Sequence, residues 1–385
     1  MRIPFLLVGA FLLLYGAMNY YIGLRGWQAF GRLCPGGGVV YWGVLLLAAS
    51  SVFLGMILGN RGLSFARFSD GLTQVGYYWL PLMLYLFMLL VAVDVLRWLD
   101  RRLHLTPDSL TLAPPAVGAA VLLCAVGLIL YGVWNATYRT EVRHYDLEIA
   151  KSVPGIEELR LVLVSDLHIG KVVDRQRINR MVERVNRLNP DLVVIPGDLL
   201  DGNLKPYVEE NIGASLAQLE AKYGIYAVFG NHDYLGGIAA ESQRLLGEAG
   251  VTVLRDEYRL VAEGFYLVGR EDYGAARWGG VTRRPLAELL NGLDATKPIL
   301  LLDHQPFNLD EGRQNGVDLQ LSGHTHHGQF FPINLITGRL FEQDWGYLNQ
   351  DGAQLIVSCG YGTWGPPLRI KSVSEIVTVT VRFKP

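Results

Sequence analysis

Four long apolar runs near the start of the chain constrain its fold more than any other feature. A transmembrane helix needs about 20 predominantly apolar residues, and runs of about that length occupy residues 3–24, 39–59, 72–96 and 112–135. The first run is too long for the apolar part of a cleaved signal peptide, and three more runs follow it. The sequence therefore predicts a four-helix transmembrane anchor over residues 1–137, set in a cell membrane.

The charged residues divide the chain at the same place. The first 135 residues hold eight Arg and four Asp but no Lys or Glu, whereas the rest holds 26 basic and 32 acidic residues. The second part has a charge content ordinary for a water-soluble domain, with a net charge of −6. Nucleic-acid binding relies on Lys and Arg that neutralise phosphates, so we expect no nucleic-acid partner.

The side of the membrane on which the second part lies is not fixed by its flanking charges. Basic residues around the four runs divide five against five between the two sides, so the positive-inside rule gives no orientation. Taken alone, the first run has Arg2 before it and Arg25 and Arg32 after it, which favours an extracytoplasmic second part.

Asp94 is the one acidic residue inside an apolar run. An intramembrane carboxylate is a candidate functional group. Arg97 follows three residues later near the end of the run, so we favour an i,i+3 ion pair between the two side chains.

The pattern after a polar connector over residues 138–154 is that of an α/β domain, over residues 155–385. Short β runs occupy residues 159–165, 191–196, 225–229, 265–268, 298–302 and 317–321, and residues 353–383 are mainly β. Apolar residues at helical spacing predict a helix over 174–188 with Asp174 as its N-cap, and a second helix within 208–222. Strands alternating with helices predict βαβ units around buried sheets.

Polar side chains capable of binding metal ions follow five of these expected strands. Such positions, beyond the carboxyl ends of strands, are where α/β folds hold their ligands. Carboxylate, amide and imidazole groups without thiolates suit Mn, Fe or Zn, and their number suits two divalent ions that share a carboxylate. The residues are Asp166, His168, Asp198, Asn231, His232, Asp233, His304, His324 and His326.

The five sequence blocks that carry these residues resemble the calcineurin-like metallophosphoesterase family. The blocks are SDLHIG, GDLLDG, GNHD, LLDHQP and SGHTHHGQ, in that order, and the resemblance covers residues 159 to about 369. Features of the C-terminal part resemble a membrane-anchored bacterial branch of this family, which includes exported phosphoesterases and hydrolases of lipid-linked diphosphates. The resemblance implies a two-sheet β-sandwich flanked by helices.

The resemblance also implies a role for each residue in the blocks. One metal ion is expected on Asp166, His168 and His326, with Asp198 bridging to a second ion. The second ion is expected on Asn231, His304 and His324. His232 is expected to face the substrate, where it stabilises phosphoryl oxygens and protonates the leaving group, while Asp233 orients its imidazole.

Four further residues near the blocks have open roles. Asp201 is expected to form hydrogen bonds within its loop. His327 stands where relatives often have Gly, and we favour a solvated loop residue over a substrate contact. Trp364 and Arg369, in a Gly- and Pro-rich turn, are candidate substrate contacts or parts of a loop that closes the sheet.

The expected activity is hydrolysis of a phosphate ester or anhydride by a hydroxide held between two metal ions. A bilayer tether raises the effective concentration of lipid head groups, so a lipid or lipid-linked substrate is the leading hypothesis. Two alternatives stay open: a water-soluble phosphodiester or nucleotide hydrolase that is merely tethered, and a non-catalytic metal-binding membrane sensor or scaffold. The presence of His232 favours an enzyme, because a site that only binds metal has no need of it.

Overall fold

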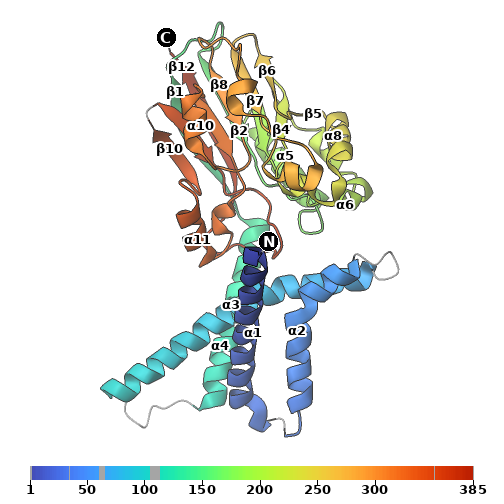
Figure 1. The fold of residues 1–385 in the computed structure, drawn as a ribbon, viewed down its shortest axis with the longest axis vertical. Coiled ribbons are helices and arrows are strands. Elements are labelled where there is room, and N and C mark those ends of the chain that lie inside the picture. Colours follow the sequence, from blue (N-terminus) through green and yellow to red (C-terminus); the bar gives the residue numbers. More distant parts are fainter. Residues whose placement is uncertain (1, 34, 60–65, 105–112, 351, 385) are drawn as a thin grey trace. The chain divides into compact units, whose positions relative to one another are not determined.

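The computed structural model describes residues 2–33, 35–59, 66–104, 113–350 and 352–384, with side chains except at 2–7, 59, 66 and 67. The chain divides into two compact units (Figure 1). The anchor unit comprises Met1–Gly132 and Gly365–Pro367, and the α/β unit comprises Val133–Trp364 and Leu368–Pro385. Arg2, used above to argue orientation, has its side chain outside the described residues.

Long helices build the anchor unit. They are α1 (Arg2–Phe30), the short turn η1 (Gly31–Leu33), α2 (Gly38–Gly59), α3 (Ala66–Leu103) and α4 (Pro114–Tyr138). Among the described residues, three helices are long and apolar enough to cross a membrane, over Gly38–Leu58, Phe68–Leu103 and Pro114–Tyr138. The prediction of an apolar helical anchor is confirmed for these three. The first expected span, residues 3–24, lies on α1 and stays a prediction.

The expected partner of Asp94 is wrong. Its carboxylate pairs with the guanidinium of Arg25 on α1 and accepts a hydrogen bond of 2.5 Å from the hydroxyl group of Tyr21. The helical spacing to Arg97 made that residue the nearest candidate in sequence. The tertiary contact between α1 and α3 instead supplies two donors.

The first sheet of the α/β unit has the order β1-β12-β2-β3-β4-β5. Strands β2 to β5 are mutually parallel, β12 is antiparallel to β2, and β1 is parallel to β12. The strands are β1 (Thr140–Ile149), β2 (Glu158–Leu163), β3 (Leu192–Pro196), β4 (Ile225–Val228), β5 (Val251–Val253) and β12 (Ser374–Phe383).

The second sheet has the order β10-β11-β9-β8-β7-β6. Its four central strands are parallel, and both edge strands are antiparallel to their neighbours. The strands are β6 (Glu257–Val261), β7 (Phe265–Gly269), β8 (Ile299–Leu302), β9 (Leu319–Ser322), β10 (Gly346–Gln350) and β11 (Ala353–Val357).

Short helices cover the outer faces of both sheets and the loops between strands (Figure 1). They are α5 (Arg175–Arg187), α6 (Lys205–Glu209), α7 (Ile212–Leu216), α8 (Ala239–Glu248), α9 (Leu286–Leu289), α10 (Leu309–Gln314), α11 (Ile333–Leu340) and the turns η4 (His232–Gly237), η5 (Ala275–Gly279) and η6 (His326–Gly328). Asp174 caps α5 as expected, since its carboxylate accepts a hydrogen bond from the backbone N–H of Arg177.

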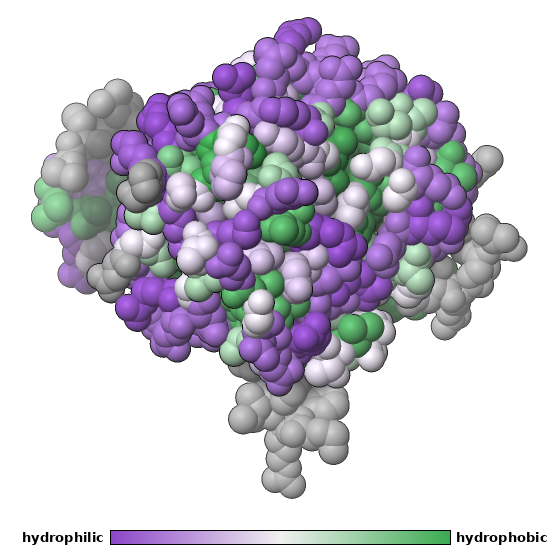
Figure 2. All heavy atoms as spheres, turned by 90° about the horizontal axis from the view of Figure 1, so that it is seen from above, coloured by the Kyte–Doolittle hydropathy of each residue, from purple (hydrophilic) through white to green (hydrophobic). Residues whose placement is uncertain are grey.

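Buried apolar side chains fill the space between the two sheets and the space between the first sheet and its helices. Leu161 of β2 and Leu300 of β8 belong to the core between the sheets, and Val162 of β2 packs with Ile178 of α5 in the second core. Alternate residues of β2 thus face opposite sides, as a strand covered on both faces requires. Figure 2 shows a surface on which hydrophilic side chains predominate. The predicted two-sheet α/β fold is confirmed.

The segment expected as a polar connector, residues 138–154, holds a strand instead. β1 pairs along its whole length with β12, from Thr140 opposite Ser374 to Ile149 opposite Phe383. The charged residues of β1 alternate with less polar ones, and only its last part is buried. An edge strand with one solvated face reads as a polar segment, which is why the sequence did not reveal it.

Candidate metal centre

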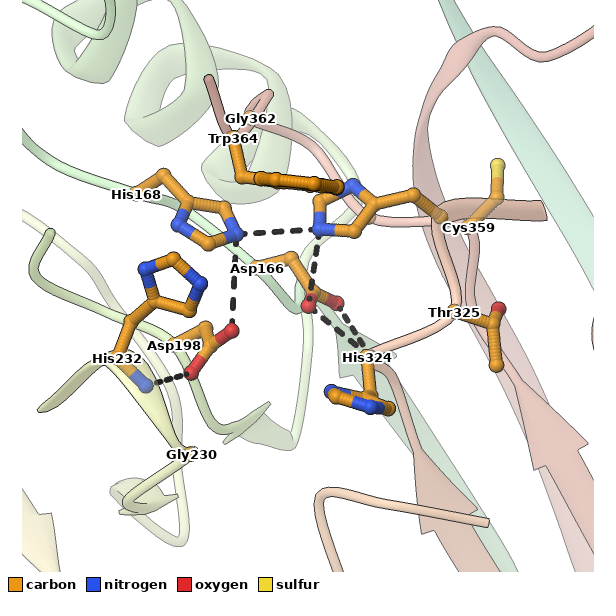
Figure 3. A network of polar contacts seen from close by, with 12 residues as sticks. Asp166, His168, Asp198, Gly230, His232, His324, Thr325, Cys359, Gly362 and Trp364 are labelled. Atoms are coloured by element: carbon orange, nitrogen blue, oxygen red, sulfur yellow. Dashed lines mark hydrogen bonds and ion pairs between the residues drawn. The ribbon is translucent and has the colours of Figure 1, made fainter. Parts of the chain in front are cut away.

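The expected ligands meet where the strands of both sheets end. Asp166 and His168 follow β2, Asp198 follows β3, and Asn231 follows β4. From the second sheet, His304 follows β8, and His324 and His326 follow β9. The structure therefore brings all seven predicted ligands to one site, although they lie up to 160 positions apart in the sequence, and Figure 3 shows Asp166, His168, Asp198 and His324 of this set.

Five of the seven candidate ligands have a left-handed backbone conformation. Asp166, His168, Asp198, His324 and His326 all have positive φ angles, between 47° and 73°. This left-handed region costs a non-glycine residue about 1 kcal/mol or more. Such strain persists where the surrounding structure holds it in place and is concentrated at functional sites.

The glycines of the sequence blocks leave the room that the ligands need. A Cβ atom on Gly230 would lie 2.2 Å from Oδ1 of Asp198 and 2.7 Å from Nε2 of His304. A Cβ atom on Gly323 would lie 2.3 Å from Oδ2 of Asp166. Any larger residue at either position would displace a ligand, which explains why a glycine precedes Asn231 and His324 in the blocks.

The first group of candidate ligands is Asp166, His168 and His326. Nε2 of His168 and Nε2 of His326 are 3.1 Å apart, and Nε2 of His326 lies 3.4 Å from Oδ1 of Asp166. Donors about 2.1 Å from one ion lie roughly 3–3.5 Å from each other. The three donor atoms therefore fit around a single divalent ion.

The second group is Asp198, His304 and His324, with Asn231 beside it. Nε2 of His304 lies 3.3 Å from Oδ2 of Asp198, and its Nδ1 donates to the carbonyl oxygen of Pro196 at 2.9 Å. That hydrogen bond leaves Nε2 with the free lone pair that a metal ligand needs. Among the described residues, buried Nε2 of His304 and Oδ1 of Asn231 make no hydrogen bond. Buried acceptors without a hydrogen-bond donor are suitable ligands for a cation.

Burial favours a neutral imidazole at His324. Desolvation and the nearby His304 lower the pKa of His324 to about 3. Metal ions bind the neutral form of histidine, so this side chain needs to lose no proton to act as a ligand at neutral pH.

His232 is held at the edge of the centre by two aspartates. Its backbone N–H donates to Oδ1 of Asp198 at 2.9 Å, and its Nδ1 lies 2.7 Å from Oδ1 of Asp201. Burial lowers the pKa of His232, but the hydrogen bond to Asp201 and the charges of both aspartates outweigh it and raise the pKa to about 9. Asp201, expected only as a hydrogen-bonding loop residue, is thus the group that orients the imidazole.

The expected role of Asp233 is wrong. Its fully buried carboxylate accepts hydrogen bonds from the backbone N–H groups of Leu199, Leu200 and Gly230. It therefore ties the loop after β3 to the loop after β4. The adjacency of Asp233 to His232 in sequence suggested a contact that the local turn does not make.

Comparison with known proteins identifies the family. A sequence model of the calcineurin-like phosphoesterases matches residues 159–328. An uncharacterised metallophosphoesterase of Aquifex aeolicus is 36% identical over 261 residues, covering 66% of this chain and 98% of the relative. The chain belongs to the calcineurin-like metallophosphoesterase family. A transmembrane protein with a metallophosphoesterase domain from Danio rerio is 33% identical over 68% of this chain, which spans 62% of that relative.

The chain is also similar to a mammalian relative and to a solved structure. A transmembrane protein with a metallophosphoesterase domain from Bos taurus is 32% identical over 76% of this chain and 68% of the relative. The solved structure of a dimetal phosphatase from Danio rerio has a TM-score of 0.35 and 15% identity, over 58% of this chain and 98% of that one. The sequence relatives confirm the predicted family, and a member of this family is a metal-dependent phosphoesterase.

Arg369 cannot contact a substrate of this metallophosphoesterase, contrary to one of the two expectations for it. Its side chain is fully buried. Its Nη2 donates to the carbonyl oxygens of Cys359, Gly360 and Gly362 and lies 3.3 Å from Nδ1 of His326. Arg369 therefore fixes the Gly-rich loop next to the imidazole ring of His326. No pattern in the sequence indicates this burial, because the acceptors are backbone atoms.

His327 and Trp364 flank the metallophosphoesterase site differently. His327 is not a freely solvated loop residue: its Nδ1 lies 2.9 Å from Oδ2 of Asp344, and its ring packs on Trp345. Trp364 lines the cavity over the ligands and is 48% exposed. His326 lines the same cavity as Trp364. A contact between Trp364 and substrate stays a prediction.

Proposed function

We propose that this chain hydrolyses a phosphate ester or anhydride with two divalent metal ions bound by the seven ligands described above. The position of Asp198 carries the proposal. Its Oδ2 lies 3.6 Å from Nε2 of His168, a candidate ligand of the first group, and 3.3 Å from Nε2 of His304, a candidate ligand of the second. A carboxylate common to two groups has the place of a bridge between two ions.

The residues around that bridge have separable tasks in the proposed reaction. Two dications supply Lewis-acid polarisation of the phosphoryl group and a nucleophile at neutral pH. His232, with its side chain 20% exposed and oriented by Asp201, donates a hydrogen bond to a phosphoryl oxygen and a proton to the leaving group. The absence of thiolate among the ligands supports Mn, Fe or Zn over a structural zinc site.

We further propose that the substrate is a lipid or lipid-linked phosphate. Three helices can cross a bilayer, and tethering to a bilayer raises the local concentration of lipid head groups. Arg25 and Arg32 favour a metal-ligand cluster on the extracytoplasmic side of the membrane. Its substrates would then be those present on the outer face of that membrane. A water-soluble phosphodiester or nucleotide is the alternative substrate.

Replacement of the bridging carboxylate tests the proposal. We expect Asp198→Asn to lower hydrolysis of bis-4-nitrophenyl phosphate by the detergent-solubilised chain roughly 100-fold or more, because Asn cannot bridge two cations with negative charge. Asp310→Asn, on the exposed part of α10, is the matched control and should keep wild-type activity. Unchanged turnover by a folded Asp198→Asn variant contradicts the mechanism.

The metal content of the same preparation separates an enzyme from a sensor. We expect about two divalent ions per chain together with turnover. Bound metal without turnover of any phosphoester would favour the non-catalytic sensor or scaffold instead.

A further inference from the structure

The cavity over the metal-ligand cluster has two chemically different walls. It measures about 290 Å³. One wall is polar and includes Asp198, Asn231, His232 and the histidines after β9. A second part of the lining is formed by Ile333 and Thr337 of α11, with Phe341 and Trp364. A phosphoryl group bound at the first wall would therefore carry its substituent along the second.

The apolar wall continues along α11 beyond the cavity. Ile333, Ile336, Thr337 and Leu340 stand at positions i, i+3, i+4 and i+7, which form one face of α11, and Phe341 follows directly after the helix with an extended backbone. We call these five residues the α11 stripe. No residue of α11 is buried, and the side chains of Ile336 and Leu340 are 52% and 68% exposed. An exposed apolar stripe that opens from a catalytic cavity indicates a binding surface for apolar groups.

Aromatic side chains extend the α11 stripe at its end nearest the ligands. The ring of Phe341 stacks on that of Phe307 at 4.8 Å and meets the ring of His324 edge-on at 5.9 Å. Phe307 is itself 42% exposed. The stripe thus contacts a candidate metal ligand through Phe341, and its one polar member is Thr337, whose hydroxyl group donates to Oδ2 of Asp344 at 2.7 Å.

The α/β unit also includes the end of a candidate membrane span. Residues 133–138 of α4 belong to this unit, and Asn135 donates hydrogen bonds of 2.9 Å to the carbonyl oxygens of Arg369 and Ser372. The hydroxyl group of Ser372 in turn donates to the carbonyl oxygen of His326 at 3.0 Å. The loop that supports a metal ligand is therefore bonded to the last turns of a helix apolar enough to lie in lipid.

We propose that the α11 stripe binds the hydrocarbon chain of a lipid phosphate whose phosphoryl group lies at the metal-ligand cluster. The inference rests on the proposed function. It assigns the selection of the substrate to the α11 stripe. Trp364 and Phe341 contact the part of the lipid where the head group joins the hydrocarbon chain. Ile336 and Leu340 contact the methylene groups farther from the phosphorus atom.

A series of chromogenic phosphodiesters tests the proposal. 4-Nitrophenyl methyl phosphate and 4-nitrophenyl octyl phosphate differ only in seven methylene groups, and both release 4-nitrophenolate. The full chain in lipid nanodiscs is assayed with each ester below its micelle concentration. We expect kcat/KM for the octyl ester to exceed that for the methyl ester by about tenfold or more, because burial of each methylene favours binding roughly fourfold at most.

Two variants assign the selectivity to the α11 stripe. We expect the double variant Ile336→Ser with Leu340→Ser to lower the octyl-to-methyl ratio by about threefold or more. Val208→Ser, which removes a 60% exposed apolar side chain from α6, is the control and should keep the wild-type ratio. A wild-type ratio near one, or an unchanged ratio in the double variant, overturns this inference and leaves the proposed hydrolysis intact. Absence of hydrolysis of both esters contradicts the proposed function instead.

Discussion

At the scale of single residues, the site contains two kinds of group. Some are candidate metal ligands, and others orient those ligands through hydrogen bonds. Asp201 illustrates the second kind. Its Oδ1 lies 2.7 Å from Nδ1 of His232 and 3.7 Å from Nδ1 of His168. One carboxylate therefore faces both an imidazole expected to contact substrate and an imidazole expected to contact metal. Such supporting groups tune the ligands they touch.

Loss of this carboxylate should impair the chemical step. We expect Asp201→Asn to lower kcat about 10- to 100-fold with little change in KM, because His232 loses the partner that orients it. The loss should be larger for alkyl leaving groups, which need a proton, than for 4-nitrophenolate, which does not. Steady-state kinetics with both ester types measures the difference. An equal loss on both would show that Asp201 acts through the metal ligands alone.

The sequence identified the candidate ligands because each stands directly after a strand, where the fold exposes side chains. It could not assign the supporting residues. Asp233 and Asp201 are both polar neighbours of the blocks, and only the course of the backbone decides that the first bonds three N–H groups while the second bonds His232. Arg369 is bonded to carbonyl oxygens, whose positions no residue type encodes.

At the scale of elements, α5 shows how local signals suffice when an element carries its own cap. Asp174 has the extended backbone of an N-cap, and its Oδ1 accepts a hydrogen bond of 2.8 Å from the backbone N–H of Arg177. The apolar face of α5 then packs on the first sheet through Ile178 and Met181. Both features depend on residues close in sequence, so the helix could be predicted from it.

Removal of the cap should destabilise the α/β unit. We expect Asp174→Ala to lower the free energy of unfolding by about 1 kcal/mol, because the first turn of α5 loses an acceptor for its backbone N–H. Asp174→Asn preserves an acceptor at this position and should cost much less. Thermal melting of the detergent-solubilised chain compares the three proteins. Equal melting temperatures for the Ala and Asn variants would contradict the role of the cap.

β1 and α11 show where local signals fail. β1 has an alternating pattern interrupted by charges, and only its long-range pairing with β12 makes it a strand. α11 has an apolar stripe typical of a helix that packs on a core, yet none of its residues is buried. In both cases the interpretation of the sequence pattern depends on a partner that is distant in sequence or outside the protein. This partner is β12 for β1 and the proposed lipid chain for α11.

At the scale of the whole molecule, both sheets contribute residues to the candidate metal centre. Asp166 and Asp198 come from the first sheet, whereas His304, His324 and His326 come from the second. Ions bound by both sets would link the sheets and stabilise the folded state over the unfolded one. They would also offset the mutual repulsion of two buried carboxylates, since site ions belong in the local charge count.

Removal of metal should therefore lower stability as well as activity. We expect a chelator to lower the melting temperature of the α/β unit by several degrees, with recovery on addition of Mn²⁺ or Zn²⁺, because ligand binding at 100 times Kd contributes about 2.7 kcal/mol. The Asp198→Asn variant should show a smaller shift. Calorimetry with and without chelator gives both values, and identical melting curves for the wild-type chain would argue against bound metal.

The place of β12 has a consequence for the timing of folding in a cell. β12 lies between β1 and β2 in the first sheet, although β1 to β11 all precede it in the chain. A ribosome delivers the anchor helices and both halves of the ligand set before it delivers this strand. The edge of β2, the strand that leads to Asp166, lacks this neighbour until synthesis has passed Phe383. We therefore expect the first sheet, and with it the backbone that leads to Asp166, to reach its native pairing only after β12 has been translated.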